Sequence, residues 1–226
     1  RLFISGSAPL LTETFNTFKQ VIGQPILERY GMSETIMLVS NPYKGNRIGG
    51  SVGLPLPGVK VRVVNEHNKP CVIDEIGNIE VKGPNVFKGY WRMPEKTAEE
   101  FTKDGWFKTG DSGTFDQDRI RVLGRRDDMI ITGGENVWPN AVEKVIATFP
   151  GVMHVVVSGV EDEHWGQRVV AWIVSSREVA PSLEEIRQHV KTQLPSFCAP
   201  AEVHVVKDIP MTSLGKVDFQ ALKKLP

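Results

Sequence analysis

Val59-Lys-Val-Arg-Val-Val64, Asn78-Ile-Glu-Val-Lys82 and Arg119-Ile-Arg-Val-Leu123 are the segments that decide the fold class. Each segment alternates apolar with polar residues or is rich in β-branched residues, and Gly, Pro, Asn or Asp residues lie between the segments. Short runs of this kind, bounded by turn-forming residues, predict β-strands. The middle of the chain is therefore predicted to be mostly β.

Toward the N-terminus the pattern predicts a strand–helix–strand unit. Leu2–Ser5 is the first predicted strand, and Thr12 begins a segment whose apolar residues recur at helical spacing until Gly23 ends it. Ile26–Arg29 is again strand-like. Because the chain begins within a predicted strand, with no cap or leader before it, we expect it to be cut from something longer.

Toward the C-terminus the pattern predicts a separate α+β domain of about 100 residues, which is a common domain size. Ser182 and Glu185 form a capping box, a frequent helix start. The predicted elements are a helix beginning at Pro139, a helix after Ser182, and strands at Val152–Val160, Val169–Val174 and Val203–Val206. We expect the boundary within Gly124–Asp128, which gives domains of residues 1–125 and 126–226.

The composition excludes several classes of partner. The 27 basic and 27 acidic residues cancel and form no run of like charge, so a nucleic acid or an anionic membrane is not expected as a partner. The two cysteines, Cys71 and Cys198, have neither disulfide-framework nor zinc-site spacing. No apolar stretch approaches the roughly 20 residues that span a bilayer. We expect a location in the cytoplasm or an organelle interior.

Tyr30-Gly-Met-Ser-Glu34 directly follows the predicted strand Ile26–Arg29. A glycine turn after a strand exposes backbone N–H groups, and a hydroxyl beside a carboxylate suits a phosphate oxygen and a magnesium ion, respectively. A surface turn with a capping serine is the more common use of so short a segment. By itself, the segment does not decide the function.

Five further residues allow both a functional and a structural interpretation. Asp111 follows a Thr-Gly pair, where a carboxylate suits the hydroxyls of a ribose or forms an Asx turn. Arg125 suits a phosphate or an exposed salt bridge. Gly133 and Gly134 indicate a close approach of the backbone to a ligand or to a packed neighbour. Lys216 is either a mobile charge for a developing anion or solvated surface.

Taken together, these segments resemble the adenylate-forming superfamily, which comprises acyl-CoA synthetases, adenylation domains of peptide synthetases and luciferases. Tyr30-Gly-Met-Ser-Glu34 is similar to the family's YGxTE segment. Gly77–Pro84, with Gly89-Tyr90 and Pro94–Thr97, is similar to its GEIxVRGPxxxxGYxxxPExT block. The order of the segments matches as well, and the resemblance covers essentially the whole chain.

Three single positions complete the resemblance. Asp111 matches the aspartate of the TGD motif, Arg125 the arginine of the GR pair before the hinge, and Lys216 the lysine of the C-terminal GK pair. The resemblance implies a mixed α/β fold: the β-rich end of a large adenylate-forming domain, followed by a small, mobile α+β C-terminal lid domain.

The resemblance also implies a role for each matched residue. Glu34 would hold Mg²⁺, Ser33 would contact a phosphate oxygen, and Asp111 would accept the ribose hydroxyls of ATP. Arg125 would contact the nucleotide near the hinge. Lys216 would bridge the substrate carboxylate and the α-phosphate, where a preorganised cation lowers the barrier. ATP, Mg²⁺ and CoA are the implied cofactors.

The same resemblance implies two further sets of residues. The adenine and acyl pocket would be lined by Gly6, Ser7, Ala8, Pro9, Glu28, Arg29, Tyr30 and Gly31. After adenylation the small domain would rotate about Asp128, which withdraws Lys216 and brings Gly133 and Gly134 to the channel for the thiol of CoA.

Among acids, malonate is the expected substrate. Leu27–Met32, Ser40–Tyr43 and Val81–Glu95 are similar to malonyl-CoA synthetases. A dicarboxylate needs a cation for its second carboxylate, and Arg47 is the candidate; a solvated loop arginine is an equally good interpretation. Met32 and Met37 are expected in the acyl pocket. The alternatives are a fatty or aromatic acid–CoA ligase, delivery to a carrier-protein thiol, and a non-catalytic binding fragment.

The chain also departs from the family pattern. The family's glycine-rich, lysine-ended phosphate loop has no copy here, so we expect the 226 residues alone to be unable to complete adenylation. Asp127 and Cys198 stand where many members carry lysine. Both changes remove positive charge, which puts the affinity for CoA and the balance at the hinge in question.

Overall fold

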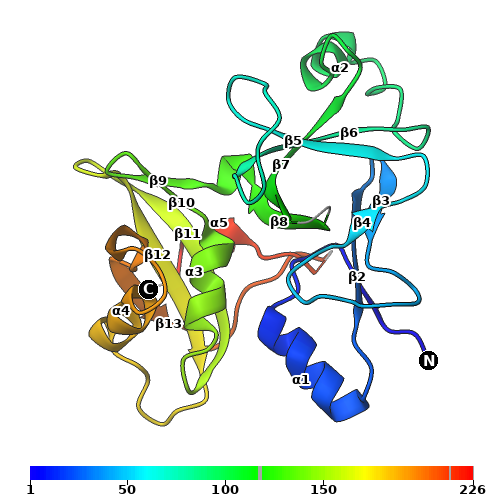
Figure 1. Ribbon diagram of the computed structural model, residues 1–226. Helices are drawn as coiled ribbons and strands as arrows, with labels where there is room; N and C mark the ends of the chain where they lie inside the picture. The colour runs from blue at the N-terminus through cyan, green and yellow to red at the C-terminus, as the bar shows by residue number, and fades with distance from the viewer. Residues whose placement is uncertain (117–118, 214, 226) are drawn as a thin grey trace. The chain divides into compact units, whose positions relative to one another are not determined.

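The computed structural model of the protein describes residues 1–116, 119–213 and 215–225 (Figure 1). The chain forms two compact units, Arg1–Arg126 and Asp127–Pro226. Each unit has its own apolar core. Among the described residues, none of the helices combines the length and the apolar character needed to cross a membrane.

The first sheet of the first unit has the order β1-β2-β3-β4. β1 is parallel to β2, and the other neighbours are antiparallel. The helix α1 (Thr12–Ile22) connects β1 to β2 and ends at Gly23, whose φ of 76° gives the left-handed cap that glycine favours. The predicted strand–helix–strand unit is therefore present. The strands are β1 (Ile4–Ser5), β2 (Leu27–Met32), β3 (Ile36–Ser40) and β4 (Leu54–Pro55).

The second sheet of this unit is an antiparallel meander with the order β5-β6-β7-β8. Its apolar residues share one core with those of β3; Leu38, Val39, Ile79, Val81 and Ile120 are at most 1% exposed. The elements are β5 (Lys60–Val64), β6 (Gly77–Lys82), β7 (Phe107–Asp116) and β8 (Arg119–Arg125), with the short helix α2 (Pro94–Glu100) between β6 and β7. The predicted β-rich middle of the chain is thus a single sheet.

The second unit is a sheet with helices on both faces. β12 pairs with β9, β11 and β13. Its alternate residues Val169, Ala171 and Ile173 belong to the core formed with α3 and α4, whereas Trp172 packs in a second core with Leu222 of α5. Because both faces are covered, the run from Val169 to Val174 is apolar throughout.

β11 and β12 extend their predicted ranges by one to three residues at the ends that differ, β13 is shifted by one residue toward the N-terminus, and α3 begins at Pro139 as predicted. The capping box at Ser182 and Glu185 is present, with both bonds formed. The strands are β9 (Ile130–Thr132), β10 (Glu135–Val137), β11 (Val152–Asp162), β12 (Gly166–Ser175) and β13 (Glu202–Val205). The helices are α3 (Pro139–Ile146), α4 (Leu183–Lys191) and α5 (Phe219–Leu222), with 3-10 turns η1 (Arg126–Asp128) and η2 (Ser196–Cys198).

Candidate active site

The segment Tyr30–Glu34 is divided between a strand and a turn. β2 continues to Met32, so the prediction that the turn begins with the glycine is wrong, and the turn covers Ser33–Thr35. Gly31 lies in the strand beside β3, where a Cβ atom would stand 1.8 Å from the carbonyl oxygen of Ile36. Glycine is required there because the neighbouring strand passes too close for any side chain.

Asp111 lies inside β7, whereas the sequence predicted it after a turn. It is 7% exposed. The hydroxyl of Tyr30 donates a hydrogen bond to its Oδ2, and Nε of Arg125, the register partner of Asp111 on β8, lies 3.2 Å from its Oδ1. Arg125 also donates to the carbonyl oxygen of Thr109 at 2.9 Å. Three predicted site residues therefore meet at one carboxylate.

The proton between Tyr30 and Asp111 stays on the tyrosine. Burial raises the pKa of Tyr30, and the Asp111 carboxylate raises it further, while a hydrogen bond from Thr109 and the charge of Arg125 act in the opposite direction. The phenol therefore remains a donor at every physiological pH. The Asp111 carboxyl group, with a guanidinium and a phenol beside it, is a suitable acceptor for vicinal hydroxyls.

Glu34 connects to the same group of residues through a tyrosine. The hydroxyl of Tyr90 donates to Oε1 of Glu34 at 3.1 Å. Burial raises the pKa of Tyr90 and so does Glu34, whereas the charge of Arg125 lowers it. The charge of Arg125 thus acts on Tyr90, the partner of Glu34, and Arg125 also pairs with Asp111. Ser33, next to Glu34, is exposed.

The residues around Glu34 fit magnesium better than a metal that needs several protein ligands. Within residues 1–116, 119–213 and 215–225, no three His, Cys, Asp or Glu side chains are grouped so that they could hold a metal. Mg²⁺ commonly takes one or two carboxylates and completes its shell with phosphate oxygens and water. A single carboxylate beside an exposed hydroxyl is consistent with that mode of binding.

Of the residues predicted to line the nucleotide and acyl pocket, some follow β1 directly, at positions 6–9, and the others lie within β2, at positions 28–31. Gly6 directly follows β1, and a Cβ atom there would stand 3.3 Å from Cγ of Arg29. Ser7 has a φ of 69°, unusual for a residue other than glycine, and Ser7, Ala8 and Pro9 are exposed. Glu28 is buried.

Arg47 has three structural partners. Its guanidinium donates to the carbonyl oxygens of Pro42 at 3.1 Å, Pro25 at 2.7 Å and Tyr43 at 2.8 Å. These bonds hold the loop after β3, and they compete with the predicted role as the partner of a substrate carboxylate. By contrast, Arg29 pairs with β3 through its backbone, and its side chain makes no hydrogen bond or ion pair with the residues that the structure describes.

The two predicted acyl-pocket methionines are neighbours on β2 and β3. Gly31 is the register partner of Met37, and Met32 is that of Ile36. Both methionines are partly exposed. Met32 also packs against the core of the first unit. Their positions beside Tyr30 and Glu34 are consistent with the predicted lining.

In the second unit, Gly133 and Gly134 form the tight turn between β9 and β10. Their φ values are 58° and 85°, a conformation that glycine adopts without strain. A Cβ atom on Gly133 would stand 2.8 Å from the ring of Trp165, whereas Gly134 has open space around it. Packing thus accounts for Gly133, and Gly134 remains available for a ligand.

Lys216 is exposed. Thr212 donates its backbone N–H to the carbonyl oxygen of Lys216 at 2.7 Å, and Lys216 donates its own N–H to the Thr212 hydroxyl at 3.2 Å. The backbone is thereby fixed while the ammonium group stays in solvent. Asp128, the predicted hinge, belongs to the 3-10 turn η1, which contains the boundary between the units.

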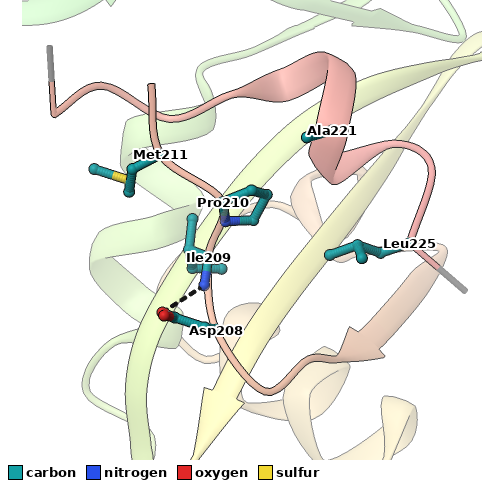
Figure 2. A pocket seen from close by; sticks show the side chains of 6 residues that line it. All are labelled: Asp208, Ile209, Pro210, Met211, Ala221 and Leu225. Atoms are coloured by element: carbon teal, nitrogen blue, oxygen red, sulfur yellow. Dashed lines mark hydrogen bonds between the residues drawn. The ribbon is translucent and has the colours of Figure 1, made fainter. Parts of the chain in front are cut away.

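The second unit has a hollow of about 370 Å³ that does not belong to the predicted site, and its lining residues are drawn in Figure 2. Its lining is mostly apolar, with one acidic residue and no cation. A triphosphate needs positive charge or backbone N–H groups, and this lining offers little of either. The hollow is lined by Asp208, Ile209, Pro210, Met211, Ala221 and Leu225.

The sequence alone assigned no role to two of the residues that complete this arrangement. Thr109 accepts from Arg125 through its carbonyl oxygen, and Tyr90 holds Glu34. Gly89-Tyr90 was part of the recognised block, and the signal was therefore available. The role of Tyr90 could not be inferred from the sequence, because Tyr90 and its partner Glu34 are 56 residues apart.

Two family models match the chain. Residues 1–91 match the model described as AMP-binding enzyme, and residues 141–216 match the model described as AMP-binding enzyme C-terminal domain. The match to the AMP-binding enzyme model thus precedes the match to the C-terminal domain model along the chain.

Curated relatives include mitochondrial malonate–CoA ligase ACSF3 of Mus musculus, with 37% identity over 244 residues, which covers 99% of this chain and 42% of the relative. Malonate–CoA ligase of Arabidopsis thaliana is 36% identical over 236 residues, which covers 99% of this chain and 38% of the relative. The chain thus spans about two fifths of the length of these relatives.

Two solved structures have a fold similar to that of this chain. ATP-bound MatB from Rhodopseudomonas palustris has a TM-score of 0.94 and 46% identity, covering 99% of this chain and 45% of that one. o-Succinylbenzoate CoA synthetase from Bacillus subtilis, in complex with its acyl-adenylate intermediate, has a TM-score of 0.85 and 32% identity, covering 100% of this chain and 46% of that one.

Proposed function

Because the chain belongs to the AMP-binding enzyme family, we propose that it is part of an acid–CoA ligase that forms an acyl-adenylate from ATP and a carboxylate, with malonate as the acid, and transfers the acyl group to CoA. The observation that carries this proposal is the buried carboxylate of Asp111, held between the Tyr30 hydroxyl and the Arg125 guanidinium. That arrangement suits the two hydroxyls of a ribose. The Tyr90–Glu34 pair supports a phosphate and metal position close by.

Each residue has a part in the first half-reaction. Asp111 accepts the ribose hydroxyls, Arg125 orients Asp111 and the nucleotide, and Ser33 contacts a phosphate oxygen. Glu34 would hold Mg²⁺, which supplies positive charge for the phosphates when it is bound. Lys216 stabilises the negative charge that develops where the substrate carboxylate attacks the α-phosphate; pyrophosphate leaves.

In the second half-reaction, the second unit has a different role from the one it has in adenylation. We propose that residues 126–226 act as a mobile domain that turns about Asp128, so that Lys216 serves adenylation and the turn at Gly133 and Gly134 serves transfer to the thiol of CoA. The open space around Gly134 supports this role, because a pantetheine chain needs a path free of side chains. Residues 1–125 supply the nucleotide site throughout, and the protein works in the cytoplasm or an organelle interior.

The similarity to relatives named malonate–CoA ligases supports malonate as the acid. A second acid is favoured by a relative named 2-succinylbenzoate–CoA ligase, from Geobacillus kaustophilus, which is 37% identical over 229 residues. Both acids carry a second carboxylate. Arg47 and Arg29 are the two candidates to bind it, and the three carbonyl partners of Arg47 weigh in favour of Arg29.

The decisive experiment measures CoA-dependent AMP formation by the full-length protein with malonate, methylmalonate, 2-succinylbenzoate, acetate, a medium-chain acid and an aryl acid. We expect malonate to give the highest kcat/KM. Asp111→Asn should raise the KM for ATP by at least about tenfold, since it removes one charged acceptor. Absence of AMP formation with every acid would refute the proposal.

The same panel distinguishes the two arginines. If Arg29 binds the second carboxylate, Arg29→Met should lower kcat/KM for malonate far more than that for acetate, and Arg47→Met should lower both equally. The reverse result would restore Arg47 as the substrate cation. Equal losses for both acids in both variants would mean that neither arginine selects the acid.

A further inference from the structure

The segment Gly83–Thr97 makes a series of bonds to the turn that carries Glu34, and these bonds are of two kinds. Some fix the backbone of the turn, and one fixes the carboxylate of Glu34. We infer that Tyr90 is a positioning residue that determines which oxygen of Glu34 is available to the metal. This inference rests on the proposed function, because it concerns the metal and nucleotide site of that function.

The backbone of the turn is held independently of Tyr90. Phe87 donates its N–H to the carbonyl oxygen of Glu34 at 2.7 Å. The side-chain amide of Asn85 donates to the carbonyl oxygens of Thr35 at 2.7 Å and Met37 at 3.0 Å. Three bonds thus fix the turn and the start of β3, and none of them involves a tyrosine. Loss of the Tyr90 hydroxyl leaves this backbone in place.

The carboxylate, in contrast, is directed by Tyr90. The phenol donates to Oε1 of Glu34 at 3.1 Å, which leaves Oε2 as the oxygen free to face a cation. A carboxylate that binds a metal through one oxygen is commonly oriented by a donor on the other. Without this bond, the Glu34 side chain regains rotational freedom that metal binding must again remove.

The ring of Tyr90 is itself held on two sides. It packs edge-on against Phe87, with ring centroids 4.8 Å apart, and the ammonium group of Lys96 lies 4.8 Å from its centroid. Such contacts restrict the ring to one orientation. The hydroxyl therefore points at Glu34 before any ligand arrives.

The backbone of Tyr90 is tied to Thr97. The N–H of Tyr90 donates to the Thr97 hydroxyl at 2.9 Å, and that hydroxyl donates to the carbonyl oxygen of Met93 at 2.8 Å. Gly89, with a φ of 146°, lies so close that a Cβ atom would stand 2.5 Å from Cγ2 of Thr97. The spacing from Gly89 to Thr97 thus serves to hold one tyrosine.

The test separates metal binding from nucleotide binding. Affinity for ATP is measured by titration calorimetry on the full-length protein without any acid, once with Mn²⁺ and once with EDTA in its place. Tyr90→Phe should weaken binding of Mn²⁺–ATP by about tenfold, the lower end of the effects of residues that orient metal ligands. Binding of metal-free ATP should change by less than about twofold.

Matched variants exclude a general structural effect. Tyr43→Phe removes the hydroxyl of an exposed tyrosine and should change neither affinity. Thr97→Ser retains the hydroxyl that holds Tyr90 and should behave as the unchanged protein, whereas Thr97→Val should weaken the metal-dependent binding. In a Glu34→Gln background, Tyr90→Phe should have no further effect on Mn²⁺–ATP, since the two residues act through one bond.

Three results would overturn the inference: equal losses with and without metal, a loss that multiplies with that of Glu34→Gln, or no loss at all. If Tyr90→Phe does not fold, as judged from its melting temperature, the Thr97→Ser and Thr97→Val pair gives the same answer. Failure of the proposed function looks different. The unchanged protein would then bind Mn²⁺–ATP with the predicted dependence on Tyr90 while it formed no AMP with any acid.

Discussion

A buried carboxylate, Asp111, and a partly buried one, Glu143, show how differently single residues are compensated. Asp111 has a guanidinium and a phenol beside it. Glu143 on α3 accepts a hydrogen bond from the N–H of Val157 at 2.8 Å. Burial therefore raises the pKa of Glu143 from 4.5 to about 7, Asp128 raises it as well, and the Val157 bond and Lys144 lower it. Asp111 is suited to an ionised role, and Glu143 takes up a proton near neutral pH.

Glu143→Gln should therefore change how stability depends on pH. Because the pKa of Glu143 is higher in the folded state, the folded protein binds more protons between pH 4.5 and about 7, and its stability falls as pH rises through that window. The loss is at most about 3 kcal/mol. The variant lacks this titration, so its free energy of unfolding at about pH 8 should lie closer to its value at about pH 5. Urea unfolding at both pH values measures this.

The control for that experiment is Glu178→Gln, which alters an exposed glutamate in the same unit. It should leave the pH dependence unchanged. An equal slope for Glu143→Gln and the unchanged protein would mean that Glu143 is ionised in the fold at all these pH values.

The three hydrogen bonds of Arg47 lead to a prediction about stability that does not depend on any substrate. Arg47→Met removes a charged donor from three carbonyl oxygens and should lower the free energy of unfolding by about 2 kcal/mol or more. Lys44→Met, at an exposed neighbour in the same loop, should cost less than about 0.5 kcal/mol. Thermal unfolding of both variants provides the comparison, and equal costs would mean that the three bonds are not stabilising.

At the scale of elements, the sequence pattern predicted the features that interactions between nearby residues determine. The helix Thr12–Ile22 and the capping box at Ser182 were predicted because a glycine cap ends the first and side-chain bonds begin the second helix. The strand conformation at Gly31 and at Asp111 was not predicted, because the glycines that suggested turns there lie inside β2 and β7. Their conformations depend on partner strands: the register shifts between Tyr30 and Gly31 and between Ser112 and Gly113.

Gly31→Ala tests this dependence on a partner strand. The new Cβ atom would stand 1.8 Å from a backbone oxygen of β3, so the two strands must separate. We expect a cost of at least about 3 kcal/mol, or loss of soluble protein. Gly23→Ala meets no atom within 4 Å and should cost only about 1 kcal/mol, from its left-handed conformation. Similar costs for the two variants would contradict the close approach of β3.

At the scale of the whole molecule, sequence motifs identified residues that the fold brings together from distant positions. Tyr30, Asp111 and Arg125 were named individually, and the structure joins them at one carboxylate. Their supporting partners were not found, because Tyr90 and Thr109 act through a hydroxyl and a backbone oxygen. No residue type marks such contacts in a sequence.

The division into two units predicts that the half-reactions can be separated. Lys216→Ala in the full-length protein should slow adenylation by about 10²- to 10³-fold, since it removes one preorganised charge. Transfer of the acyl group from added malonyl-adenylate to CoA should remain within about threefold of the unchanged rate. Pyrophosphate release and thioester formation measure the two steps, and a parallel loss in both would contradict separate roles for the two faces of this unit.

Arg125 ends β8, and only Arg126 lies between it and the second unit. The arginine that pairs with Asp111 therefore lies almost at the boundary between the two units. Under the proposed function, a seated nucleotide damps motion at this boundary, and departure of AMP releases it. Release of AMP and the return of the enzyme to its starting conformation then occur in the same step.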